Sequence, residues 1–384
     1  MAVALVVVVI LVLALVFSSL SNNKQPTIPP RLDAIPASAV KMTPQTDLFP
    51  PVLRSDEWET PVPMPGPVNT AGAEDSPFIS PNGSRFFFFF TPDLHIPVEK
   101  QLGDKETGVW WSQKVGGQWT EPQRIVFGTL QSLEGDEFAV GYTLWFGSIR
   151  VGNLGEIDIY NSTLEDGQWK DVTNAGQQLN VEYDIGAFCF TPDGSALYYG
   201  KGGDIWKCAK SVGGWAQPQK VPNLDGISGK DQPFVTPAGD ELWFTGNSVH
   251  QYTGPSLYRC NLTGTGGWGA PQEIVSRFAA EPTLDSEGNL YFVHHYVTQN
   301  ISLIEADIYV AMHKGSGSAL AASAPAPRSH IGIDQIAAAG LTSAVLMLLP
   351  TGCRGYRCGA WERQYPLKPP PPSGGAFEAK GLRH

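Results

Sequence analysis

A tryptophan phrase that recurs about every 45–60 residues constrains the fold of this chain more than any other feature. Its copies are centred on Trp58, Trp119, Trp169, Trp215 and Trp268, and four of the five carry a proline three residues later. A unit of this length cannot bury its apolar surface alone and must pack against its neighbours. The repeat therefore predicts a modular architecture in which these tryptophans are structural.

A second phrase alternates with the tryptophans and predicts a β-hairpin in each unit. It consists of an extended run, a tight turn of the Pro-Asp-Gly kind, and an aromatic run such as Phe86–Phe90. Proline presets φ for the turn, and glycine accepts the positive φ that follows. The copies begin near Asp75, Asp136, Phe188, Asp231 and Glu281. The copy at Asp136 lacks the Pro-Asp-Gly turn and departs most from the pattern.

A third phrase, Asp-Ile-Tyr or Asp-Ile-Trp, predicts a further strand in the units that carry it. Its copies begin at Asp158, Asp204 and Asp307, and we expect these aspartates to be structural. Three or four short antiparallel strands in each repeated unit are the pattern of a β-propeller blade. The apolar run Phe86–Phe90 fits a middle strand that neighbouring blades cover on both faces.

The order of the phrases predicts how such a ring closes. The chain opens with a tryptophan phrase at Trp58 and ends with an Asp-Ile-Tyr strand that no tryptophan phrase follows. Every unit becomes complete if the N-terminal strand joins the last blade, which also removes free sheet edges. We therefore expect an all-β fold, a five-bladed β-propeller of four-stranded antiparallel blades spanning residues 52–312.

Together the three phrases resemble the WD-like repeats of TolB-type propellers, and the Gly-Gly-Trp-x-x-Pro spacer is similar to a variant found in bacterial envelope proteins. The resemblance covers all five units. It implies the propeller fold, whereas propellers of this kind include binding, scaffolding and enzymatic members.

The two ends of the chain differ from the repeats. Residues 2–17 are apolar without interruption, which predicts that residues 1–21 are a signal peptide or an N-terminal membrane anchor, with a tether through residues 2–20 in the second case. The proline-rich residues 22–51 are expected to be a linker, and residues 313–384 a low-complexity, disordered tail. An extracytoplasmic location follows, secreted, periplasmic or anchored to the cell envelope.

The net charge limits the kinds of binding partner that the sequence predicts, and the cysteine content bears on disulfide bonds. The formal net charge of −11 disfavours nucleic acid, because an anionic surface repels phosphate. The five cysteines do not form a disulfide framework: Cys208 and Cys260 hold the same position in consecutive units, too far apart to bond, and are expected to pack as small apolar side chains. No motif for a cofactor or metal is present, and His294 and His295 are expected to be structural or surface residues.

The candidate binding residues are the acidic side chains that open each inner strand, because these strands converge on the central channel. They are Glu74, Asp75, Asp136, Glu137, Glu182, Asp184, Asp231 and Glu281. Such a ring of acids can bind a cation, a basic peptide or sugar hydroxyls, and a carboxylate pair is what glycoside hydrolysis requires. The alternative is that repeated acids accept backbone hydrogen bonds at strand starts and belong to the repeat itself.

The sequence thus predicts a monomeric binding or scaffold module that recognises a protein or glycan at its channel mouth. A carbohydrate-active enzyme that uses mouth carboxylates is the alternative.

Overall fold

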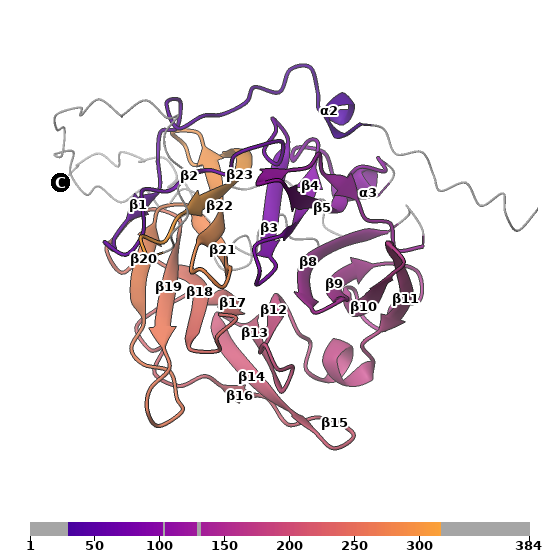
Figure 1. Cartoon of the computed structure of the whole chain (residues 1–384), viewed down its shortest axis with the longest axis vertical. Coiled ribbons are helices and arrows are strands. Elements are labelled where there is room, and N and C mark those ends of the chain that lie inside the picture. The colour runs from indigo at the N-terminus through magenta and orange to yellow at the C-terminus, as the bar shows by residue number, and fades with distance from the viewer. Residues whose placement is uncertain (1–29, 103, 129–131, 316–384) are drawn as a thin grey trace, which may run out of the picture.

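The inner strands surround a common centre (Figure 1) in the computed structural model, which describes residues 30–102, 104–128 and 132–315. They are β3 (Ala73–Ile79), β8 (Leu133–Val140), β12 (Phe188–Phe190), β17 (Asp231–Val235) and β21 (Ala279–Leu284). Each of them contacts the next along the chain, and β21 contacts β3.

Three inner strands begin sheets of their own. One sheet joins β8 to β9 (Thr143–Ile149), β10 (Asp158–Glu165) and β11 (Gln168–Asn174). The next joins β12 to β13 (Ala196–Lys201), β14 (Asp204–Ser211), β15 (Gly214–Trp215) and β16 (Gln219–Lys220). The third joins β17 to β18 (Glu241–Asn247), β19 (Pro255–Asn261) and β20 (Gln272–Ser276). These are antiparallel sheets of an all-β protein, as predicted.

The first and last units share one larger sheet. Its last-unit strands are β21, β22 (Leu290–Val297) and β23 (Leu303–Ala311), and its first-unit strands are β3, β4 (Arg85–Thr91), β5 (Gly108–Val115), β6 (Gln118–Trp119) and β7 (Gln123–Arg124). A single parallel bridge between Ala306 and Ala73 joins the two halves. The two ends of the repeat region therefore lie side by side.

Two short N-terminal strands extend the outer edges of the last two units. Strand β1 (Val52–Leu53) pairs with β20, and β2 (Val62–Pro63) pairs with β23. Between them Trp58 bridges to His313. The offset of the tryptophan phrases thus corresponds to pairing between the N-terminal strand β2 and strand β23 of the last unit.

Each recurring tryptophan packs against another aromatic ring. The ring centroids lie 5.6 Å apart for Trp58 and Trp243, and 6.2 Å apart for Trp268 and Tyr198. The other pairs are Trp119 with Phe86, Trp169 with Phe87 and Trp215 with Phe190. Trp58, Trp169 and Trp268 reach the preceding unit, so the phrase ties neighbouring sheets together.

The degenerate hairpin at Asp136 forms in spite of its missing turn sequence. Strands β8 and β9 pair from Leu133 with Ile149 to Val140 with Thr143. The two-residue connection holds Gly141 at a φ of 62°, which glycine adopts without strain. A hairpin therefore forms here without the Pro-Asp-Gly phrase.

Helical structure is confined to short segments: α2 (Arg31–Ala34), α3 (Val98–Gln101) and a π-helix, η1 (Gln178–Glu182). Among the described residues, no helix has the length and apolar character that crossing a membrane requires. The predicted signal or anchor, residues 1–21, and residues 316–384 of the predicted tail lie outside the described residues.

The cysteines of the repeat region behave as the sequence predicts. Cys189, Cys208 and Cys260 are free and buried. Cys208 pairs with Leu197 and Cys260 with Leu242, the same register in consecutive sheets. Burial raises the pKa of each thiol, which favours the neutral, unreactive form.

Candidate functional site

Four inner strands carry the same β-bulge, and its residues face the centre of the ring. The bulge residues Ser76, Asp136, Gln232 and Glu281 have φ values of 48°, 52°, 52° and 58°. The strand register shifts at each of them. A bulge re-aims a side chain, and a positive φ in a residue other than glycine costs free energy that surrounding contacts must offset. All four line one central cavity of about 60 Å³.

Hydrogen bonds hold the carboxylate of Glu281 in this cavity. The backbone N–H of Ser76 donates to Glu281 Oε2 (2.6 Å) and to Asp75 Oδ1 (3.0 Å). The amide Nε2 of Gln232 donates to Glu281 Oε1 (2.5 Å). Burial and the neighbouring Asp75 raise the pKa of Glu281 well above its usual range. Three strands therefore converge on one carboxyl group.

Glu137 lines the same cavity, but hydrogen bonds do not hold its carboxyl group as they hold that of Glu281. Its side chain is buried, with the residue 5% exposed, and neither carboxylate oxygen accepts a hydrogen bond from another residue of the described segments. Burial, and after it the charges of Asp136 and Asp75, raise the pKa of Glu137 well above the usual value. Such a group is costly to bury without a partner.

A second cavity, of about 830 Å³, adjoins the central one and shares Ser76, Asp136 and Phe188 with it; we call it the mouth cavity. Glycine-rich turns line it, among them residues 200–203. Its charged lining residues are Asp136, Glu156, Asp184, Lys201 and Asp231. Lys201 Nζ lies 3.5 Å from Asp184 Oδ2 and donates to the Tyr183 carbonyl (2.7 Å), so the acids outnumber the bases.

Gly200 is required where β13 passes Asp231. A Cβ at this position would lie 1.7 Å from Asp231 Oδ1 and 3.0 Å from the Asp231 Cα. We expect Gly200→Ala to lower the free energy of unfolding by about 1–3 kcal/mol, because Asp231 and its backbone must move. Gly264→Ala is the matched control, since nothing lies within 4 Å of a Cβ there. Urea unfolding of both variants tests this, and equal stability would contradict it.

The eight predicted acids separate into distinct settings. Asp136, Glu137 and Glu281 line the central cavity, Asp75 lies beside it next to Ser76, and Asp184 and Asp231 line the mouth cavity with Asp136. Glu74 lies elsewhere: it is fully buried and accepts hydrogen bonds from Thr70 N (2.9 Å) and Thr70 Oγ1 (2.6 Å). Glu182 is exposed on η1 and lines neither cavity.

The aspartates of the third phrase organise loops and ion pairs. Asp158 accepts hydrogen bonds from the backbone of Leu154 and Gly155. Asp204 forms ion pairs with Lys220 (2.8 Å) and Lys230 (3.0 Å). Asp307 is buried beside Lys41, and none of the three lines either cavity.

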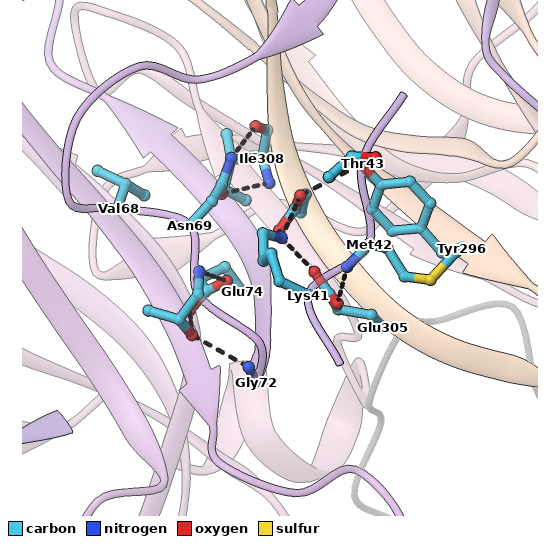
Figure 2. A network of polar contacts seen from close by, with 12 residues as sticks. Lys41, Met42, Thr43, Val68, Asn69, Gly72, Glu74, Tyr296, Glu305 and Ile308 are labelled. Carbon is cyan, nitrogen blue, oxygen red and sulfur yellow. Dashed lines mark hydrogen bonds and ion pairs between the residues drawn. The ribbon is translucent and has the colours of Figure 1, made fainter. Parts of the chain in front are cut away.

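The described part of the predicted linker, residues 30–51, packs against the first and last units instead of standing free as a spacer. Figure 2 shows Lys41 and Met42 lying against Glu305 and Tyr296. Lys41 Nζ forms ion pairs with Glu305 and with Asp307 (2.5 Å to each oxygen), and the Met42 N–H donates to Glu305 Oε2 (2.7 Å). Arg31 is also buried, with its guanidinium 3.4 Å from Glu74 Oε1. Proline content alone does not reveal these partners.

The two histidines of β22 are buried. His294 Nε2 lies 2.8 Å from Asp47 Oδ2, another contact to the N-terminal segment. Burial lowers the pKa of His295. In the described residues, no group of three or more His, Cys, Asp or Glu side chains is arranged to hold a metal ion.

No family model and no curated protein matches the chain significantly. It is similar to a putative TolB from Agrobacterium tumefaciens, with 14% identity and a TM-score of 0.37 over 65% of this chain and 80% of that one. It is also similar to TolB from Acinetobacter baumannii (19%, TM-score 0.32, 64% of this chain and 54% of that one) and to the Dos1 propeller (8%, TM-score 0.30, 63% and 54%). The chain thus spans about half of each of the latter two. All these TM-scores lie below 0.5.

Proposed function

We propose that the chain is a five-bladed β-propeller that binds a protein ligand at the mouth of its central channel. The blades are the units that begin at β3, β8, β12, β17 and β21, and β2 completes the last of them. The observation that carries the function is the mouth cavity of about 830 Å³, a volume typical of ligand sites. We place the module outside the cytoplasm, because residues 2–17 have the composition of an export segment.

The lining of the mouth favours a basic protein segment over a glycan. Four carboxylates face one lysine that is already paired, so the cavity attracts positive charge. Leu154 and Val181, next in sequence to the lining residues Gly155 and Asn180, are exposed and offer apolar contact area to a protein surface. Leu154 and Val181 are neighbours in space, because their adjacent residues Gly155 and Asn180 approach each other closely.

A peptide array and a glycan array, both probed with the full chain, test this proposal. We expect capture of peptides that contain basic residues, and a loss of affinity of about 10-fold, or ~1.4 kcal/mol, for Asp231→Asn. This substitution removes the charge and keeps the oxygen that accepts the Gln232 N–H (2.9 Å). Asp225→Asn, at an exposed residue outside the cavity, is the control. Capture or turnover of glycans alone would overturn the proposal.

A further inference from the structure

The central cavity, which adjoins the mouth cavity, combines acidic and aromatic walls. The rings of Phe78, Phe138 and Phe234 line it, with centroids 4.7 Å apart for the first pair and 6.4 Å for the second. All three are buried. Aromatic faces attract a desolvated cation through their quadrupole and also accept methylene groups. The bulges of neighbouring strands add carboxyl groups to these rings.

We propose that the central cavity seats the ammonium group of a lysine side chain from the protein ligand, with Glu137 as its counter-ion. This rests on the proposed function and names the ligand chemistry of the same site. The two cavities share Ser76, Asp136 and Phe188, so a ligand bound in the mouth cavity lies next to the central cavity.

Glu137 is the observation that points to a ligand. It is a buried carboxyl group whose two oxygens accept no hydrogen bond from another described residue. The other acids nearby are held differently, since Glu281 accepts hydrogen bonds from Ser76 and Gln232. Arg124 is the basic residue whose charge acts on Glu137, but it forms an ion pair with Glu134 (3.3 Å) and donates to three backbone carbonyls. A ligand cation supplies the partner that the chain does not.

The lining of the cavity favours an ammonium over a guanidinium or a metal ion. A volume of about 60 Å³ for a water-sized probe holds about four to six water molecules, enough for an ammonium and its neighbouring methylene groups. A guanidinium is a wider, planar group with five donors that need acceptors in its plane. Metal binding has no support here, because the described carboxylates do not converge as a coordination set.

Ionisation of Glu137 accompanies binding. The charged groups that act on it are Asp136 on its own strand, Asp75 and Arg124, and Glu281 lines the same cavity. Since burial and Asp136 raise the pKa of free Glu137, the empty site favours the neutral form of this carboxyl group. The lysine ammonium favours the carboxylate, so binding releases a proton, and affinity rises with pH up to the pKa of free Glu137.

The test uses the full chain and two hexapeptide libraries, one with free lysine and one in which every lysine is acetylated. We expect capture from the first library, at least 10-fold weaker capture from the second, and the same loss for Glu137→Gln with the free library. Glu137→Gln replaces the carboxyl group by an amide of similar size that carries no charge, so its Tm should be close to that of the wild type. Glu165→Gln, on the exposed end of β10, is the control.

The outcomes separate this inference from the proposed function. One outcome is equal capture from both libraries that Glu137→Gln leaves unchanged and Asp231→Asn abolishes. It would contradict binding of a lysine ammonium in the central cavity and leave the mouth cavity as a binding site. No capture from either library would overturn both. If Glu137→Gln does not fold, the comparison of free with acetylated lysine on the wild-type chain decides, because equal affinity for the two contradicts an ammonium seat.

Discussion

Replacing Trp58 by alanine is expected to lower the free energy of unfolding by about 3–5 kcal/mol. Trp58 is 2% exposed, and its indole packs edge-on against Trp243 at 5.6 Å. Its Nε1 donates to the Gly288 carbonyl (2.9 Å), and the guanidinium of Arg259 lies 5.2 Å from its ring. The substitution removes a large buried ring and the contacts that hold the N-terminal segment to the last two units.

Trp206→Ala is the matched control for this prediction. Trp206 lies on β14, is partly exposed, and has none of the ring contacts found for the recurring tryptophans among the described residues. We expect Trp206→Ala to lower the free energy of unfolding by about 1 kcal/mol. Urea unfolding at constant pH measures both values. Equal losses for the two variants would mean that the N-terminal segment does not stabilise the ring.

Lys41→Met is the second substitution for which we expect a large effect. It should lower the free energy of unfolding by about 3 kcal/mol at pH 8. The carboxylates of Glu305 and Asp307 are 1% and 0% exposed, so removal of the ammonium leaves two buried acids without their counter-ion. Lys41 itself is 37% exposed, which lowers the loss below that of a fully buried pair. Lys220→Met breaks a more exposed pair, with Asp204, and should lower the free energy of unfolding much less than Lys41→Met.

The cost of Lys41→Met should depend on pH. Burial and Asp307 raise the pKa of Glu305 to about 8 even with Lys41 present, and burial raises that of Asp307. The folded state then binds more protons than the unfolded state above about pH 4.5, so stability falls as the pH rises toward 8. Without Lys41 both pKa values rise further and this fall becomes steeper. Urea unfolding at pH 5 and pH 8 measures the difference, and a loss independent of pH would contradict the origin in these carboxylates.

Much of the fold was predictable because repeats reveal period and order. The hairpins, the structural tryptophans and the pairing of the N-terminal strand with β23 follow from the positions of the phrases along the chain. The packing of residues 30–51 was not predictable, because isolated side chains such as Lys41 and Asp47 find their partners more than 240 residues away. No local periodicity encodes contacts of that kind.

The candidate site was predictable only in part. The acidic phrases located the inner strands correctly, but their register depends on the bulges that place Ser76, Gln232 and Glu281 around one point. A one-residue shift of register exchanges the two faces of a strand, so equivalent-looking acids end in different settings. Glu74 is buried beside Thr70, whereas its neighbour Asp75 accepts a hydrogen bond from Ser76, which lines the central cavity. Glu182 falls on a helical turn that the repeat does not contain.

Hydrogen exchange of the full chain, with and without a lysine peptide captured from the free library, tests the mouth as the binding site most directly. We expect slower exchange in residues 135–138, 184–188 and 200–203, which line the two cavities. The outer strand β11 should exchange at the same rate in both samples. Slower exchange along β11 alone, with the cavity residues unchanged, would contradict a binding site at the channel mouth.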